Sequence, residues 1–240
     1  MRVSGNSACR AESVAGVESA VGSFASSREV RSGALASEQV LWLEKRAKRA
    51  FDFVFSLLAL LFISPVLALI AISIKLDSEG PVLYISERIG QNGRRFRFLK
   101  FRTMVKDADA LRGSLLHLNE RQGHLFKISN DPRVTRLGRI LRRFSLDELP
   151  QFFNVLMGDM SVVGPRPCLP GEYARYTEEQ RRRVEAMPGI TGLWQVKARN
   201  DPSFESYYRL DLQYVENWSF FLDMKILLET IAVVYAGTGQ

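Results

Sequence analysis

Two adjacent carboxylates, Asp147 and Glu148, are the residues of this chain best suited to chemistry. They lie in the run FSLDELPQFFNVLMGDMSVVGPRP (144–167), which ends in a stiff Gly164-Pro165-Arg166-Pro167 segment. Neighbouring positions on a helix point about 100° apart, so the two acids cannot easily share one task. A nucleophile beside a metal ligand fits this arrangement, and so does a pair of N-terminal acids that only stabilise a helix.

The element predicted to position the two acids is a helix that starts beside them. Ser145-x-x-Glu148 has the form of a capping box ahead of the apolar run 149–157. Pro150 fits poorly inside a first turn, so the N-cap could lie one or two residues later. In either register Asp147 lies near free backbone N–H groups and the positive end of the helix dipole, which favours its ionised form.

Composition limits the partners of such a site. The 240 residues, 46% of them hydrophobic, suit one domain with an appendage. A net charge of +7 and a pI near 9.6 predict anionic company, which means nucleic acid, a nucleotide or an anionic membrane surface. The two cysteines, Cys9 and Cys168, are far apart and indicate neither a disulfide framework nor a zinc site, so a reducing compartment is expected.

Residues 1–44 are predicted to form a disordered tail. Half of the first 40 residues are Ser, Ala or Gly, with scattered charges and no sustained period. Such a segment buries too little apolar surface to offset its chain entropy. It also lacks the continuous apolar core of a signal peptide.

Residues 45–76 are predicted to enter the membrane. The uncharged stretch 53–74 has 22 residues, which would make a helix of roughly 33 Å, long enough to cross a bilayer. Pro65, after Ser64, interrupts the middle of this helix. Basic residues flank both of its ends, and the positive-inside tendency predicts that basic flanks stay on the cytoplasmic side. These features predict a re-entrant helical hairpin, with the Ser64 hydroxyl bonded to a carbonyl that the bend frees. A kinked spanning helix is the alternative.

The remaining portion, 77–240, is predicted to be mainly helical with a small β-hairpin. Gln91-Asn92-Gly93 is a hairpin-type turn between a strand at 82–85 and the alternating basic and apolar run 94–104. An amphipathic helix rich in arginine follows Asn130-Asp131-Pro132-Arg133; such a helix can lie on an anionic membrane or cover a core. Further elements are predicted as a polar helix at 105–122, a helix at 172–187, a β-type run at 188–196, a helix capped by the residues 200–203 and a last helix at 220–234.

Several motifs, taken in order, resemble one family. They are the basic residues before the Ser64-Pro65 break, FLKFRTM (98–104), the long run 130–167, PGITGLWQV (188–196) and YVENWSFFLDMKI (214–226). From about Lys45 to its end the chain resembles the bacterial sugar transferases, the small monotopic phosphoglycosyl transferases. The C-terminal part of the chain is most similar to the hexose-1-phosphate transferases that start exopolysaccharide synthesis. The chain departs from the family pattern in Phe152, where an aliphatic residue is usual, and in the N-terminal tail.

The resemblance implies a reaction and roles for residues. A UDP-hexose would donate its sugar-1-phosphate to polyprenyl (undecaprenyl) phosphate, with Asp147 as the nucleophile that forms a covalent phosphosugar intermediate and UMP as the product released. Glu148 would hold a divalent cation, Mg²⁺, against the charge of the diphosphate. Arg166, with Arg102 and Arg133, would bind phosphate.

The implied fold is α+β and mainly helical, that of a monotopic protein with interfacial amphipathic helices. The catalytic portion would face the cytoplasm at the inner membrane and contact anionic lipid. The sequence leaves open which hexose and which glycan pathway are served, the role of Asp159, and the oligomeric state, a dimer included.

Two other classes of protein are weighed against this interpretation. A membrane-tethered nucleic-acid binder would use the charge and the RFRFLKFR run (95–102), but no RNA or DNA module is recognisable, and two carboxylates would repel phosphate without a metal. No nucleic acid is therefore expected as a partner. A non-enzymatic scaffold would use the hairpin only as an anchor.

Overall fold

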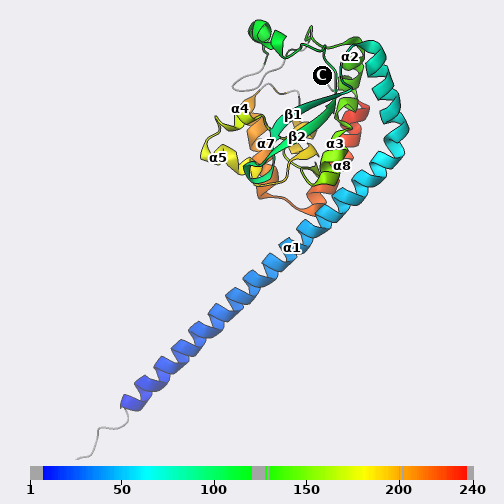
Figure 1. Cartoon of the computed structure of the whole chain (residues 1–240). Coiled ribbons are helices and arrows are strands. Elements are labelled where there is room, and N and C mark those ends of the chain that lie inside the picture. The colour runs from blue at the N-terminus through cyan, green and yellow to red at the C-terminus, as the bar shows by residue number, and fades with distance from the viewer. Residues whose placement is uncertain (1–7, 121–127, 129, 200, 202, 237–240) are drawn as a thin grey trace, which may run out of the picture. The chain divides into compact units, whose positions relative to one another are not determined.

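The computed structural model describes residues 8–120, 128, 130–199, 201 and 203–236. The chain divides into two compact units, Met1–Ala47 and Lys48–Gln240 (Figure 1). The first unit consists of the N-terminal part of helix α1, in which the Arg46 guanidinium lies 4.1 Å from the centre of the Trp42 ring. The second unit holds the rest of α1 and the elements that form the site.

Helix α1 spans Ala8–Asp77, so helix occupies most of the segment that the sequence predicted to be disordered. Residues 1–7 lie outside the described residues. No proline occurs before Pro65, and adding a residue to an existing helix needs no new nucleation. Helix can therefore extend backward from the apolar stretch into residues that would not start one alone.

The predicted two-armed hairpin is not confirmed, because α1 is assigned as one continuous helix through Pro65. After Lys48 the helix curves instead around the globular part of its unit (Figure 1). Proline cannot donate to the carbonyl four residues earlier, which belongs to Leu61. The Ser64 Oγ donates to that carbonyl oxygen at 2.9 Å, as predicted. The helix thus bends at the proline without being interrupted. A re-entrant path through the membrane stays a prediction.

The second half of α1 is strongly apolar. Within the described residues, Trp42–Asp77 is the one helix long and apolar enough to cross a membrane by length and composition, with a mean hydropathy of 2.8 in its most apolar window. The side chains in the middle of this apolar half are exposed at the protein surface; Leu61 is 66% and Phe62 78% exposed.

Both ends of this apolar half nevertheless pack against the same globular body. Near its start, the ring of Phe55 lies 6.2 Å from the ring of Phe152. Near its end, Ile74 belongs to a buried cluster with Phe101 and Leu141. The helix therefore leaves the body and returns to it.

Polar side chains fasten the start of the apolar half to strand β3 (Ser161–Val163). The Asp52 Oδ1 accepts from the Val162 N–H at 2.9 Å, and the Lys48 Nζ donates to the Val163 carbonyl at 2.9 Å. Lys48 also pairs with the buried Asp223 at 2.5 Å. These bonds satisfy the polar groups of residues packed inside the protein.

Arg49 fastens the same turn of α1 to helix α3 (Gln151–Met157). Its guanidinium donates to the carbonyls of Val155 at 2.6 Å and Leu156 at 3.1 Å. These belong to the last turn of α3, where helical carbonyls have no partner of their own. The membrane-type helix is therefore bonded to the end of α3 as well as to β3.

The predicted β-hairpin is confirmed. Strand β1 (Leu83–Ile89) pairs antiparallel with β2 (Arg95–Phe101). Asn92 in the connecting turn has φ 54°, a left-handed conformation that asparagine tolerates well.

The other elements partly differ from the predicted ones. The helix α2 (Arg136–Arg143), the Ser203 cap of α7 (Phe204–Glu216) and the last helix α8 (Phe220–Tyr235) form as expected, while residues 200 and 202 lie outside the described part. The predicted helix at 172–187 is divided into α4 (Pro170–Tyr173), α5 (Glu178–Arg181) and a 3₁₀ turn (Arg182–Val184). The predicted helix at 105–122 is a 3₁₀ segment, Ala110–Leu118, with 121–122 outside the described part. The β-type run at 188–196 is a short strand β4 (Gly189–Thr191) followed by α6 (Leu193–Lys197).

Strand β4 lies parallel to β3 at very close range. The Gly164 N–H donates to the Thr191 carbonyl, and the Gly189 N–H donates to the Pro165 carbonyl, both at 2.9 Å. A Cβ on Gly164 would lie 2.2 Å from the Met187 carbonyl oxygen, and one on Gly189 would lie 2.0 Å from the Gly164 nitrogen. Only glycine allows this backbone approach.

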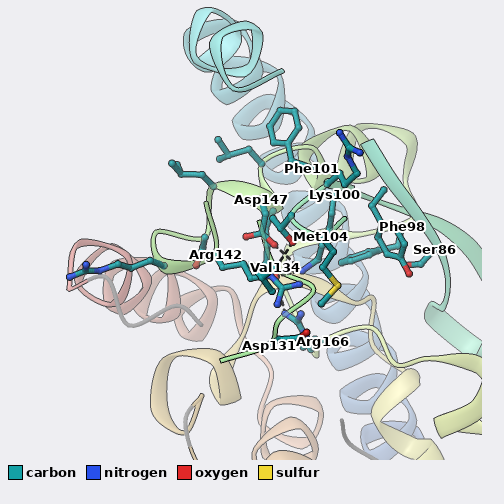
Figure 2. A pocket seen from close by; sticks show the side chains of 18 of the residues that line it. Ser86, Phe98, Lys100, Phe101, Met104, Asp131, Val134, Arg142, Asp147 and Arg166 are labelled. Carbon is teal, nitrogen blue, oxygen red and sulfur yellow. Dashed lines mark hydrogen bonds and ion pairs between the residues drawn. The ribbon is translucent and has the colours of Figure 1, made fainter. Parts of the chain in front are cut away.

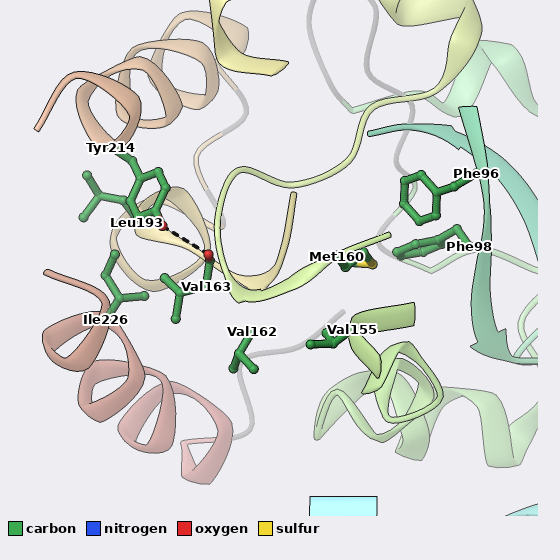
Figure 3. Packing of buried hydrophobic residues seen from close by; sticks show 9 residues of the cluster. All are labelled: Phe96, Phe98, Val155, Met160, Val162, Val163, Leu193, Tyr214 and Ile226. Atoms are coloured by element: carbon green, nitrogen blue, oxygen red, sulfur yellow. Dashed lines mark hydrogen bonds between the residues drawn. The ribbon is translucent and has the colours of Figure 1, made fainter. Parts of the chain in front are cut away.

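The main core lies between the hairpin, α3, β3 and the C-terminal helices (Figure 3). Its buried members are Phe96, Phe98, Val155, Met160, Val162, Val163, Leu193, Tyr214 and Ile226. The Tyr214 hydroxyl shares its one hydrogen between the Asp223 carboxylate at 2.7 Å and the Val163 carbonyl at 3.1 Å, so the core also contacts the strand that precedes the Gly164-Pro165-Arg166-Pro167 loop.

We expect Asp223→Ala to cost about 3–5 kcal/mol of unfolding free energy, because it leaves a buried cation unpaired. Asp223 is 2% exposed and accepts from Lys48, from the Tyr214 hydroxyl at 2.7 Å and from the Trp218 indole at 3.2 Å. Denaturant unfolding of the detergent-solubilised protein measures the loss. The control is Glu216→Ala, which breaks an exposed pair with Arg182 and should cost under about 1 kcal/mol. Equal losses in the two variants would contradict the expectation.

Candidate active site

Asp147 and Glu148 lie in a 3₁₀ turn, Leu146–Glu148, between α2 and α3. The predicted capping box is wrong, because Ser145 has a left-handed φ of 57° and its side chain makes no capping bond. Its hydroxyl instead accepts from Arg199 Nη1 at 3.0 Å. The N-cap position of α3 falls on Pro150. The carboxylates therefore precede the helix, and the expected stabilisation by its first free N–H groups does not apply.

Lys100 supplies a buried cation between the two acids. Its Nζ lies 2.7 Å from Glu148 Oε1 and 3.6 Å from Asp147 Oδ2. The sequence analysis did not single it out. The sequence did contain a pattern that could have identified Lys100. Alternation along β2 puts Lys100 on the same face as the buried Phe96 and Phe98. A lysine on the buried face of a strand needs an acidic partner.

Arg166 reaches the same carboxylate from the other side. Its Nη1 lies 3.2 Å from Glu148 Oε1. The structure thus brings together three of the predicted site residues, Asp147, Glu148 and Arg166. Their chemical roles stay predictions.

Arg102 and Arg133, also predicted to bind phosphate, contact protein groups other than the carboxylate pair, and their phosphate-binding role stays a prediction. The Arg102 guanidinium donates to the backbone carbonyls of Ser78, at 2.8 Å, and Glu79, just beyond α1. Arg133 makes a buried ion pair with Asp131 at 2.6 Å and donates to a backbone carbonyl. Both line the cavity wall, but these guanidinium groups are held by the protein itself.

Three arginines that the sequence analysis did not assign to the site add positive charge. Arg142 donates to the Thr103 hydroxyl at 3.0 Å, Arg199 to Ser145, and Arg88 to the Pro167 carbonyl at 3.3 Å. Burial lowers the pKa of each guanidinium; for Arg142 and Arg199 the nearby carboxylates oppose this. Partners this distant in sequence could not be read from local patterns.

The two carboxylates differ in electrostatic environment. Burial raises the pKa of Asp147 above its ordinary value, Lys100 opposes this rise and Glu148 adds to it. Burial also acts to raise the pKa of Glu148, but the closer charges of Lys100 and Arg166 outweigh it and hold that pKa well below the ordinary range. The pair therefore consists of Asp147, whose pKa is raised, and Glu148, which is held in its ionised form.

A cavity of about 1050 Å³ opens beside the pair (Figure 2). Figure 2 shows Lys100, Asp147, Arg142 and Arg166 among its lining side chains. The described lining residues include ten basic and five acidic side chains, and the basic ones nearest the pair are Arg88, Lys100, Arg142, Arg166 and Arg199. An excess of partly buried cations favours an anionic ligand.

The donor atoms suit a magnesium ion only if a ligand completes the shell. Among the described residues, no group of three or more His, Cys, Asp or Glu side chains could hold a metal. Mg²⁺ in proteins commonly uses one or two carboxylates together with substrate phosphates and water. The adjacent Asp147 and Glu148 meet that requirement at the edge of the cavity. Asp159 lies outside the cavity lining, 3.9 Å from Arg94.

Comparison with known proteins gives a consistent set of relatives. The sequence model described as bacterial sugar transferase matches residues 43–237. The galactosyl transferase CpsE of Streptococcus agalactiae is 45% identical over 194 residues, which are 80% of this chain and 43% of that protein. The exopolysaccharide production protein ExoY of Rhizobium meliloti is 43% identical over 198 residues, 81% of this chain and 88% of the relative. The undecaprenyl-phosphate galactose phosphotransferase of Salmonella typhimurium is 42% identical over 197 residues, 80% and 41% respectively. The chain thus spans less than half of two of these relatives and most of ExoY.

We expect Lys100→Met to lower the unfolding free energy by about 3–5 kcal/mol near neutral pH, because it leaves two buried carboxylates without their shared cation. As the pH falls and Asp147 takes up a proton, the difference from the unmodified protein should shrink. Denaturant unfolding at several pH values tests this. Lys225→Met removes an exposed lysine and serves as the control with little change. A Lys100→Met loss that did not depend on pH would contradict the charge-based explanation.

Proposed function

This chain belongs to the bacterial sugar transferase family, and we propose that it transfers hexose-1-phosphate from a UDP-sugar to polyprenyl phosphate, releasing UMP. Relatives are named undecaprenyl-phosphate galactose and glucose phosphotransferases. The observation that carries the proposal is the carboxylate pair of unlike pKa, contacted by Lys100 and Arg166 beside a large cavity whose lining has more basic than acidic side chains. Such a site fits a diphosphate substrate and a carboxylate nucleophile.

Asp147 is the proposed nucleophile. A raised pKa makes its carboxylate more basic, and the ionised form of this carboxylate is the nucleophile. One carboxylate oxygen attacks the β-phosphorus, and the bond from this phosphorus to the bridging oxygen breaks. UMP leaves with that oxygen and its electron pair, and the hexose phosphate stays bonded to Asp147. A phosphate oxygen of the polyprenyl acceptor then attacks the same phosphorus and returns Asp147 to the carboxylate.

Glu148 is the proposed support for this chemistry. Lys100 and Arg166 keep it ionised, so it would hold the divalent cation with phosphate oxygens of the donor. Mg²⁺, when bound, would neutralise charge on the diphosphate. Arg166 can offer its other guanidinium nitrogen to a phosphate oxygen while it stays paired with Glu148.

Membrane attachment follows from the acceptor, because a long polyprenyl chain stays in the bilayer while a UDP-sugar is soluble. The apolar half of α1 would enter the cytoplasmic membrane from the cytoplasmic side and return to it. The packing of Phe55 and of Ile74 on one globular body supports this path, because a spanning helix would carry its two ends to opposite faces. The product would begin the assembly of an exopolysaccharide or another surface glycan.

We expect Asp147→Asn to abolish UMP release, because an amide has no anionic oxygen to attack phosphorus. Without acceptor, mass spectrometry of the unmodified protein should find a phosphosugar adduct on the Asp147 peptide, and the kinetics should be ping-pong. The rate of the UMP-releasing step should fall on the acid side as Asp147 protonates, at a higher pH than for an ordinary aspartate. Asp107→Asn, at an exposed acid outside the cavity lining, is the control. Turnover by Asp147→Asn near the unmodified rate would overturn the covalent mechanism.

We expect both flanks of the apolar stretch to face the cytoplasm, since each carries basic residues. In a Cys9→Ser background, a cysteine at position 37 (Ser37→Cys) should resist labelling from outside intact cells; Cys168 is buried. Replacing Ser64 with Ala and Pro65 with Leu should straighten the helix and allow it to span, so that the probe becomes reactive. Labelling of the probe without these two replacements would rule out the re-entrant path.

A further inference from the structure

The loop Gly164-Pro165-Arg166-Pro167 is held from outside rather than by its own hydrogen bonds. Its two prolines have no N–H to donate, so the loop offers mainly carbonyl oxygens. Donors from three distant segments reach them: Gly189 N to Pro165 O at 2.9 Å, Arg183 Nη2 to Arg166 O at 2.9 Å, and Arg88 Nη1 to Pro167 O at 3.3 Å.

The Arg183 side chain is deeply buried, at 2% exposure. Three acceptors share the two hydrogens of its Nη2: the Arg166 carbonyl, the Tyr207 hydroxyl at 2.6 Å and the fully buried Asp211 carboxylate. Its Nη1 donates to the Tyr176 hydroxyl at 2.8 Å. The planar guanidinium is therefore fixed on several sides, which makes it a rigid support for the carbonyl that it contacts.

Arg183 does not line the large cavity, whereas Arg166 does. The main-chain carbonyl of Arg166 rests on Arg183, while its side chain pairs with Glu148 at 3.2 Å. A shift of the carbonyl would therefore move the guanidinium that faces the reacting groups. Tyr207 adds a second, weaker bond to the same carbonyl at 3.4 Å.

We propose that Arg183 is a positioning residue that sets the placement of Arg166 at the carboxylate pair. The proposal rests on the proposed function, because it needs Arg166 to act on the phosphate groups of the donor. Arg183 itself touches no substrate. A point charge would not replace it, because one lysine ammonium cannot keep the contacts with Asp211, Tyr207 and the Arg166 carbonyl together.

The test is a double-mutant cycle on the rate of UMP release from a UDP-sugar with polyprenyl phosphate present. Arg183→Lys should reduce the rate about 10- to 100-fold, the cost of a small misplacement of a catalytic group. In an Arg166→Ala background the same change should reduce the rate by less than about threefold, because the group that Arg183 positions is gone.

A merely structural role for Arg183 predicts the same fold-loss in both backgrounds, and that result would overturn the proposal. So would an unchanged rate for Arg183→Lys with Arg166 present. An Arg166→Ala variant as active as the unmodified protein would instead contradict the role of Arg166 in the proposed function, and the two failures are thus distinguishable.

Two further variants keep the test decisive if Arg183→Lys folds poorly. Asp211→Asn preserves the shape of the cluster while removing the charge that fixes Arg183, and its cycle with Arg166→Ala should show the same non-additivity. Tyr176→Phe is the matched control, because it removes a bond to Arg183 without touching Arg166. It should keep the rate within about threefold, since the 2.9 Å bond to the Arg166 carbonyl remains. A Tyr176→Phe loss as large as that of Asp211→Asn would count against the proposal.

Discussion

Buried polar bonds at the start of the apolar half of α1 are the constraint on which the site depends. Asp52 and Lys48 hold β3, which leads into the Arg166 loop, and Arg49 holds the end of α3, which follows the carboxylate pair. Each bond joins a side chain of one helix to the backbone of a segment next to the candidate site, more than a hundred positions away. The apolar helix is therefore part of the architecture of the site, in addition to being its proposed membrane anchor.

The second constraint is the balance of charge inside the site. Two carboxylates cannot be buried side by side without compensation, and Lys100 with Arg166 provides it unequally. Glu148 receives the closer contacts and is held ionised, which leaves Asp147 as the more basic of the two. The same cations that stabilise the protein are thus available to an anionic substrate, whereas an open, solvated surface would serve a nucleic-acid binder better.

Local signals predicted local structure well. The Asn92-Gly93 turn, the Ser203 cap and the Ser64 bond to a freed carbonyl each depend on residues within a few positions of one another. The capping box at Ser145 failed because a left-handed residue and a contact from Arg199, 54 positions later, took its place. Lys100, 48 positions from Glu148, and the divided helix at 172–187 likewise depend on packing between distant segments. Motif order pointed to the acids and Arg166, which the structure brings together, while Arg102 contacts Ser78, 24 positions away, and Arg133 pairs with the nearby Asp131.

The close contact between the backbones at Gly164 and Gly189, here called the glycine crossing, limits how the sequences of such proteins can change during evolution. The two backbones are in direct contact, so the loop after β3 and the turn before β4 fit only each other. If recombination took the loop after β3 from one parent and the turn before β4 from another, the two backbones would not match. No side chain lies between them that could compensate for the mismatch. New substrate preferences would therefore arise more readily by exchanging the whole block from β3 to β4, or by altering the cavity wall around an unaltered crossing.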